Sequence, residues 1–298
     1  MLRTLADALR SQALLEFELP LAPPRLEELP AAHPDAQALD IWSPAGRFLI
    51  IIGARGPLTL AFESTLFDLL HEMRYPAPPP RRARGGALIA KLQGTEGAAA
   101  AACYQRPPGE HVRPQHATIP KLLDIGRLLA RLHQLAEVHP ASVPDPFAGV
   151  PLESRLPAGH DRDKLAPFLL TSLAGLPLGA AHGSMGPLQM LFVGERVSGV
   201  LPSGHAAAMA LVLDLAATAL AWMIGAESPP AVLRAILSGY QSLRRLNPDE
   251  RDALFPVLQL AAAREGAVRL WTGDAETCLS PLSLVEGLGV QAVRAAAG

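Results

Sequence analysis

The N-terminal third of the chain mixes short apolar runs with turn-forming segments, a pattern that predicts a small sheet with few helices. Residues 1–19 carry apolar positions at helical spacing, and a proline-rich connector follows over residues 20–30. The β-branched apolar run at residues 48–52 lies between two glycines and predicts a buried strand. The same patterning predicts a helix over residues 62–73 and strands over residues 87–92 and 98–104.

After the predicted sheet, the spacing of apolar positions becomes helical, most clearly over residues 119–135. Residues 190–193 and 197–201 are short apolar strands joined by a turn, which predicts a hairpin. Further helices are predicted over residues 161–174, 206–224, 230–243, 248–264 and 282–297. We therefore expect an α+β protein with two domains. Residues 1–104 form an N-terminal lobe of one helix, a proline-rich connector and a small antiparallel sheet, and residues 105–298 form a helical C-terminal lobe.

Composition narrows the classes of partner. A net charge of -2 with 18% charged residues argues against nucleic acid as a partner, because no basic face is implied. No apolar run approaches the roughly 20 residues that span a bilayer, so no membrane association is expected. The N-terminus lacks a clean export signal, and Cys103 and Cys278 lack metal-ligand spacing, so we expect a cytoplasmic protein.

One loop carries a motif with a chemical meaning. Residues 182–189 read HGSMGPLQ and resemble the catalytic loop H-[GA]-D-x-x-x-x-N of kinase-like small-molecule phosphotransferases. Collinear passages at residues 126–133, 213–216, 239–246 and 267–271 extend the similarity. From about residue 40 to its end, the chain resembles homoserine kinases of the aminoglycoside-phosphotransferase-like type. The resemblance implies a bilobal protein-kinase-like fold with a small β-rich N-lobe and a mainly helical C-lobe.

The same resemblance shows which groups an active member uses. ATP would lie between the lobes, the loop Asp would deprotonate the acceptor hydroxyl, and the loop Asn and a later Asp would hold magnesium. Those three positions are Ser184, Gln189 and Pro202 in this chain. Serine does not ionise at neutral pH, glutamine displaces its carbonyl oxygen by a methylene, and proline has neither a side-chain oxygen nor an N–H. We therefore expect no intact catalytic set and no metal site.

Two scaffold residues of the loop are retained, His182 and Asp214. His182 is interpreted as hydrogen-bonding the loop backbone rather than pairing with Ser184 as a hydrolase, because no nucleophile elbow is present. Asp214 is interpreted as anchoring the loop backbone from a buried helix rather than ligating a metal. A metal site shared by His182 and His205 lacks a carboxylate or cysteine to complete it.

Other polar and aromatic residues receive structural interpretations. The turn at residues 33–37 has no glycine, and the strand at residues 50–52 has no lysine for a nucleotide phosphate. Without that lysine, Glu63 and Glu72 are expected to be solvent-exposed. Surface or capping roles are expected for His111, His116, His133 and His139, and core positions for Trp222 and Trp271.

The sequence thus favours a pseudokinase of the homoserine kinase family that acts by binding and uses no cofactor. Its partner, unknown in identity, would be a protein or a small ligand in the interlobe cleft. The alternative is an atypical ATP- and magnesium-dependent phosphotransferase that uses Glu195, or Asp161 and Asp163, as substitute carboxylates. A third hypothesis is a structural subunit of an active paralogue. Enzymatic activity stays open at this point, although its absence is favoured.

Overall fold

The computed structural model describes residues 2–21, 23, 25–29, 36–53, 57–94, 97–138 and 158–298. They form two compact units, one of residues 1–109 and 198–206 and the other of residues 110–197 and 207–298. This grouping differs from the predicted boundary at residues 104 and 105. The backbone of Arg106 still bonds to Arg47, and the amide of Val200 donates to Pro76, so both segments remain attached to the first unit.

The first unit is built on a sheet whose strands are all antiparallel, as the sequence predicts. Its strand order is β1-β2-β3-β6-β4, and β5 also pairs with β6. The strands are β1 (Arg25–Leu29), β2 (Ala36–Ser43), β3 (Gly46–Gly53), β4 (Pro80–Arg81), β5 (Ile89–Gly94) and β6 (Gly97–Gln105). The turn at residues 33–37, which contains no glycine, falls largely outside the described residues.

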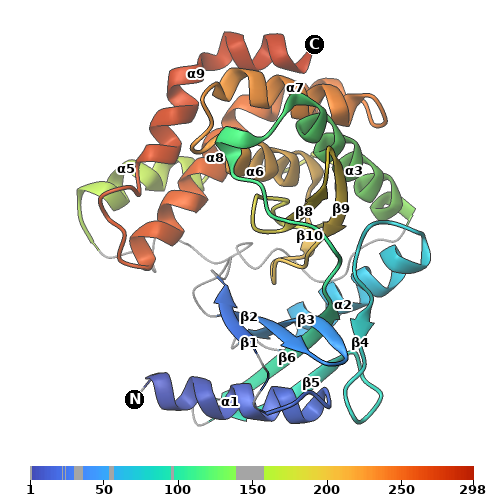
Figure 1. Cartoon of the computed structure of the whole chain (residues 1–298). Helices are drawn as coiled ribbons and strands as arrows, with labels where there is room; N and C mark the ends of the chain where they lie inside the picture. Colours follow the sequence, from blue (N-terminus) through green and yellow to red (C-terminus); the bar gives the residue numbers. More distant parts are fainter. Residues whose placement is uncertain are drawn as a thin grey trace. The chain divides into compact units, whose positions relative to one another are not determined.

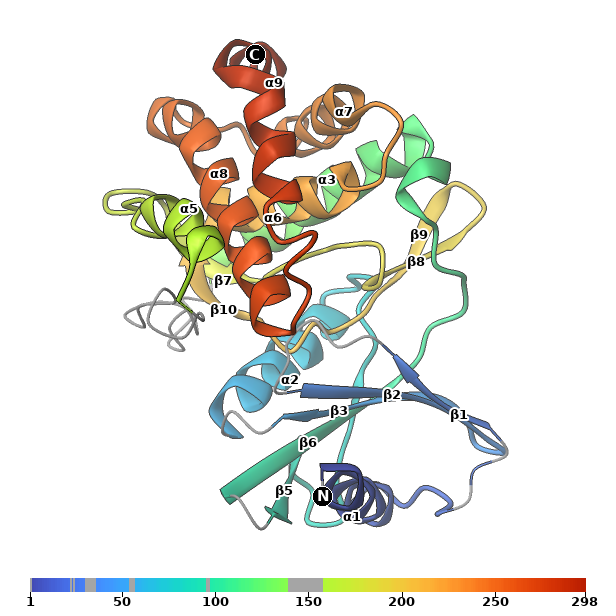
Figure 2. The same ribbon diagram turned by 90° about the vertical axis from the view of Figure 1, so that its left-hand side faces the viewer.

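Helices α1 (Leu2–Glu16) and α2 (Pro57–Glu72) cover opposite faces of this sheet, as Figure 2 shows. Ile50 and Ile52 share a core with α1, whereas Tyr104 on the other face meets Phe67 of α2 edge to face. Because β3 is covered on both sides, residues 49–52 are all buried. This explains why the strand reads as a continuous apolar run.

The second unit is mainly helical (Figure 1), so the α+β class is confirmed. Apart from the main sheet there are two short two-stranded sheets in the described residues, β7 (Leu178–Ala181) with β10 (Ala207–Ala210) and β8 (Met190–Val193) with β9 (Arg196–Val200). The helices are α3 (Ile119–Val138), α5 (His160–Leu169), α6 (Leu211–Met223), α7 (Pro229–Gln241), α8 (Pro248–Trp271) and α9 (Ser280–Ala297), with a 3-10 turn at Pro114–His116.

The predicted helix over residues 206–224 is wrong at its start. Residues 207–210 form β10, which pairs with β7 so that Ala207 lies opposite Ala181, and α6 begins only at Leu211. Alanine favours helix locally, but the cross-strand pairing overrides that preference. The predicted hairpin over residues 190–201 is confirmed as β8 and β9.

Helices α3 and α7 meet through two glycines. A β carbon on Gly126 would lie 2.1 Å from the carbonyl oxygen of Ile236, and one on Gly239 would lie 2.1 Å from the carbonyl oxygen of Leu123. Only hydrogen side chains permit this approach, so the two helix backbones are in direct contact. The contact matters for the site because α3 and α7 each contribute a residue to it.

Both cysteines, Cys103 and Cys278, are free and buried. Within the described parts of the chain, every helix is too short or too polar to cross a bilayer.

Candidate functional site

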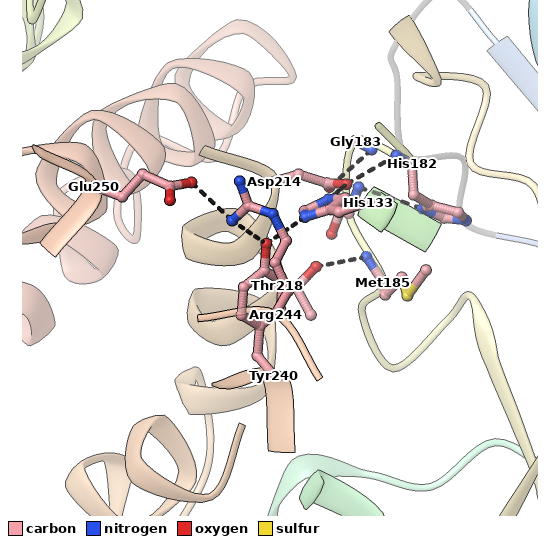
Figure 3. Close-up of polar contacts among 10 residues, drawn as sticks. His133, His182, Gly183, Met185, Asp214, Thr218, Tyr240, Arg244 and Glu250 are labelled. Carbon is pink, nitrogen blue, oxygen red and sulfur yellow. Dashed lines mark hydrogen bonds and ion pairs between the residues drawn. The ribbon is translucent and has the colours of Figure 1, made fainter. Parts of the chain in front are cut away.

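The motif loop starts where β7 ends, and a carboxylate from α6 holds its first turn. Asp214 accepts hydrogen bonds from the backbone N–H groups of His182 and Gly183, each at 2.9 Å (Figure 3). Gly183 has a φ of +92°, a conformation that favours glycine and turns both amides toward the carboxylate. The anchoring contact predicted for Asp214 is present.

Behind Asp214 lies a buried chain of hydrogen bonds that ties α3, α6, α7 and α8 together. His133 Nε2 lies 3.1 Å from Asp214 Oδ2, and His133 Nδ1 lies 2.7 Å from the Tyr240 hydroxyl. Arg244 Nη1 donates to that hydroxyl at 3.0 Å and to Glu250 at 2.9 Å. Arg244 can only donate, so the Tyr240 hydroxyl accepts from Arg244 and donates its own proton to His133 Nδ1. His133 Nε2–H in turn is assigned as the donor to Asp214.

The surface or capping role predicted for His133 is therefore wrong, since its side chain is fully buried. His133 follows the apolar stripe of α3, where Leu129 and Leu132 are also buried. Its ring finds polar partners on two other helices, which the sequence pattern alone did not reveal. A buried imidazole with both nitrogens paired carries no unsatisfied polar cost.

The charge state of Asp214 follows from these contacts. Burial alone raises the pKa of this carboxyl, but the hydrogen bond from His133, the electrostatic effect of the His133 and His182 rings and the hydrogen bond from the His182 amide together outweigh it and lower the pKa. The carboxylate is consequently ionised at neutral pH and accepts charge-assisted hydrogen bonds from the loop.

Residues of α6 also hold the middle of the loop. Thr218 accepts a hydrogen bond from the amide of Met185 at 3.1 Å, and the indole N–H of Trp222 donates to the Met185 carbonyl at 2.8 Å. Trp222 is fully buried, as predicted for a core aromatic. The other predicted core aromatic, Trp271, ends α8, and its side chain lies outside the described residues.

The other histidines that were predicted at the surface differ in their burial. His111 is half-buried, and its Nδ1 lies 3.1 Å from the carbonyl oxygens of both Pro187 and Met190, so it holds the far end of the loop. This role was not predicted. His116 is exposed in the 3-10 turn, and His139 lies outside the described residues.

The side chains of Ser184 and Gln189 both lie beside Gly186. A β carbon placed on Gly186 would lie 3.4 Å from Ser184 Oγ and 3.3 Å from Gln189 Oε1. The amide of Ser184 also donates to His182 Nδ1 at 3.4 Å, which agrees with the backbone role predicted for His182. The structure thus brings together two neutral polar side chains, and neither supplies an anion.

The third position, Pro202, is buried in the first unit and is followed by a segment bound to α2. Glu63 accepts hydrogen bonds from the amides of Ser203 and Gly204, both at 2.9 Å, and its side chain is fully buried. The solvent exposure predicted for Glu63 is wrong, whereas Glu72 is exposed as predicted.

A signal for the burial of Glu63 was present in the sequence. Leu60 and Phe67, three residues before it and four after it, are both buried, so Glu63 lies on the inner stripe of α2. The expectation of exposure came from the missing strand lysine. That reasoning overlooked backbone N–H groups as alternative partners for the carboxylate.

The buried carboxylates of the described residues already have protein partners. Glu63 and Asp214 accept hydrogen bonds from backbone amides. Glu250 caps α8 and binds Arg244. Asp40 binds Arg47 and Arg106. Across the described ranges, no group of three or more His, Cys, Asp or Glu side chains is placed to hold a metal ion. The motif resemblance assigns the family's two metal-ligand positions to Gln189 and Pro202, and an amide and a proline ring do not fit a magnesium site.

The carboxylates considered as substitutes belong to elements outside the motif loop. Glu195 is exposed in the β8–β9 turn, where it binds Lys121 at 2.6 Å and the hydroxyl of Thr118. Asp161 and Asp163 lie in the first turn of α5. The two histidines weighed as a metal pair, His182 and His205, belong to different units.

Burial gives Glu63 a testable pH dependence. Burial raises the pKa of Glu63 from 4.5 to about 7, although the amides of Gly204 and Ser203 oppose this effect. A raised native pKa means that the stabilising contribution is complete below pH 4.5 and is lost as the pH rises through 7. The difference corresponds to at most about 3 kcal/mol.

We therefore expect Glu63→Gln to lack a fall in unfolding free energy that the unmodified chain shows between pH 5 and pH 8. Urea denaturation at a series of pH values measures it. Glu72→Gln, on the exposed end of the same helix, should keep the fall. Parallel curves for Glu63→Gln and the unmodified chain would show that Glu63 does not titrate in this range.

Comparison with known proteins identifies relatives of this chain by sequence and by fold. No family model matches the chain. A homoserine kinase of Pseudomonas aeruginosa (strain UCBPP-PA14) is 29% identical over 246 residues, which cover 77% of this chain and 76% of that protein. A homoserine kinase of Acidiphilium cryptum (strain JF-5) is 30% identical over 237 residues, which cover 73% of this chain and 72% of the relative.

The fold has solved counterparts. An amicoumacin kinase, solved with AMP-PNP and Ca²⁺, superposes with a TM-score of 0.71 at 12% identity and covers 91% of this chain and 89% of its own. The kinase-like fold predicted from the motif loop is thus confirmed. By sequence similarity over nearly three quarters of its length, the chain belongs to the homoserine kinase family.

Proposed function

We propose that this chain is a pseudokinase, a member of the homoserine kinase family that does not transfer phosphate and acts by binding. One observation carries the proposal. The scaffold of the catalytic loop is complete around Asp214, whereas Ser184, Gln189 and Pro202 stand at the three reactive positions of the family. A loop preserved in shape without its reactive groups suits recognition better than catalysis.

Each replacement removes a different requirement of phosphoryl transfer. Ser184 offers a neutral hydroxyl where a base is needed, and Gln189 offers one amide oxygen. Pro202 has no side-chain oxygen for a cation, and hard cations such as magnesium require oxygen ligands. Because this reaction depends mostly on positioning and on charge stabilisation by the metal, the three losses reinforce one another.

The alternative is an atypical phosphotransferase, and the similarity to homoserine kinases is the observation that favours it. Such an enzyme would need ATP, magnesium and a substitute for the loop carboxylate. Glu195 is the first candidate, but its carboxylate already binds Lys121, so it would have to give up that ion pair. For this reason the alternative ranks second.

The binding role has two forms. The chain would bind a small ligand, without a cofactor of its own, or it would bind a protein, such as an active paralogue for which it serves as a structural subunit. A thermal-shift titration separates them. Stabilisation by ATP without magnesium supports a ligand-binding role, whereas no shift with ATP or homoserine supports a protein partner.

Restoring the base alone should not restore activity. We expect Ser184→Asp to release no ADP from ATP in the presence of magnesium and homoserine, because Pro202 still supplies no metal ligand. A coupled assay for ADP measures this. Homoserine-dependent release by this single variant would show that residue 202 is not the metal position and would favour the alternative.

A further inference from the structure

The segment that follows Pro202 forms a concave backbone turn aimed at one side chain. The amides of Ser203 and Gly204 both lie 2.9 Å from Glu63 Oε1, and the amide of Gly204 lies 3.1 Å from Oε2. The Ser203 hydroxyl adds a longer contact of 3.4 Å, and the amide of Ala206 also hydrogen-bonds the carboxylate. Several donors therefore converge on a single carboxyl group.

The backbone conformation of this turn is typical of an anion-binding nest. Gly204 has a φ of +79°, and a turn that contains such a residue directs successive N–H groups to the same side. The Ser203 hydroxyl accepts the amide of His205 at 3.1 Å, which closes the turn. Most of the groups that receive the carboxylate are therefore backbone amides.

Glu63, the residue bound by this turn, lies on a helix that is firmly packed on the sheet. Ser64, the next residue of α2, lies within 2.9 Å of the Tyr104 hydroxyl on β6, and Phe67 packs edge to face on the same ring. These contacts fix α2 on the sheet and so fix the position of the Glu63 carboxylate. Glu63 and Ser203 are 140 residues apart in sequence. In protein kinases a helix Glu pairs with a strand lysine. Here β3 has only apolar residues at positions 50–52.

We infer that residues 203–206 form an anion-binding site for a carboxylate, and that Glu63 is its built-in occupant and positions this segment without a metal ion. In an active member, a carboxylate at position 202 and its cation would hold the segment. In this chain the carboxylate comes from α2, and the groups that receive it are backbone amides. The inference does not depend on whether the chain transfers phosphate.

The test is chemical rescue of Glu63→Ala, since this truncation leaves a space for a small carboxylate beside the nest. Hydrogen exchange at pH 8, where Glu63 with its pKa of about 7 is mostly ionised, measures the protection of the amides of Ser203, Gly204 and Ala206. We expect protection to fall by about tenfold or more in Glu63→Ala. Sodium acetate should restore it in a concentration-dependent way, whereas acetamide, or sodium chloride at equal ionic strength, should not.

Matched variants make the result interpretable. Glu72→Ala, at the exposed end of α2, should show neither the loss nor a response to acetate, and the unmodified chain should not respond. If Glu63→Ala does not fold, Glu63→Gln replaces it. One amide oxygen cannot accept every donor, so protection of Gly204 should fall while that of amides in α6 is unchanged.

Unchanged protection in both Glu63 variants would overturn the inference, as would a failure of acetate to act or an equal effect of acetamide. Either result would leave the proposed function untouched. Conversely, turnover of ATP by the unmodified chain would overturn the proposed function and leave the anion site standing.

Discussion

Replacing Asp214 with asparagine is expected to lower the free energy of unfolding by about 3–5 kcal/mol. The carboxylate accepts hydrogen bonds from two loop amides and from His133, and all three donors are buried or half-buried. An amide has only one acceptor oxygen, so its NH₂ group would face a donor. At least one buried N–H would then lose its partner.

Urea denaturation of Asp214→Asn measures this effect. Asp252→Asn is the matched control, because Asp252 is exposed on α8 and its substitution should change stability by less than about 0.5 kcal/mol. Hydrogen exchange adds a local readout, since the amides of His182 and Gly183 should lose protection first. A change below about 1 kcal/mol would show that Asp214 does not anchor the loop.

Substitution of Gly126 by alanine is the second large effect that we expect. The added β carbon would lie 2.1 Å from the Ile236 carbonyl oxygen and 2.7 Å from the Tyr240 amide nitrogen, both on the rigid backbone of α7. The helices would have to separate, and overpacking of this kind costs about 3 kcal/mol or more. The separation would also displace Tyr240 from His133.

At a helical glycine with open space around it, substitution by alanine is expected to raise the stability instead of lowering it. At Gly287 of α9, a β carbon would have no other atom within 4 Å, so Gly287→Ala should stabilise the chain by up to about 1 kcal/mol. Thermal or urea unfolding of the two variants side by side compares them. A stable Gly126→Ala protein would contradict the close contact between α3 and α7.

The sequence predicted most elements because their apolar spacing is regular. The helix at residues 119–135 and the strand at residues 48–52 follow directly from such spacing. The helix predicted at residues 207–210 is wrong, because a run of alanine and methionine has no strong strand preference and forms β10 only by pairing with β7. Pairing with a distant segment is not encoded in local periodicity.

Site residues were predictable from the sequence where both the residue and its partner belong to a recognisable motif. Asp214 was found in this way, together with the loop that it anchors. His133 and Glu63 were misplaced because polar residues were assigned to the surface, although both lie on buried helical stripes. Their partners, Tyr240 and Ser203, are more than 100 residues away, and no spacing rule connects them.

The most direct test of the account is an assay of homoserine-dependent ADP release by the purified chain with ATP and magnesium. The homoserine kinase of Pseudomonas aeruginosa provides the positive control under the same conditions. The pseudokinase proposal, in which Ser184 and Pro202 replace the loop carboxylate and a metal ligand, predicts no release above a reaction without protein. Release that depends on both homoserine and the chain would contradict the pseudokinase proposal.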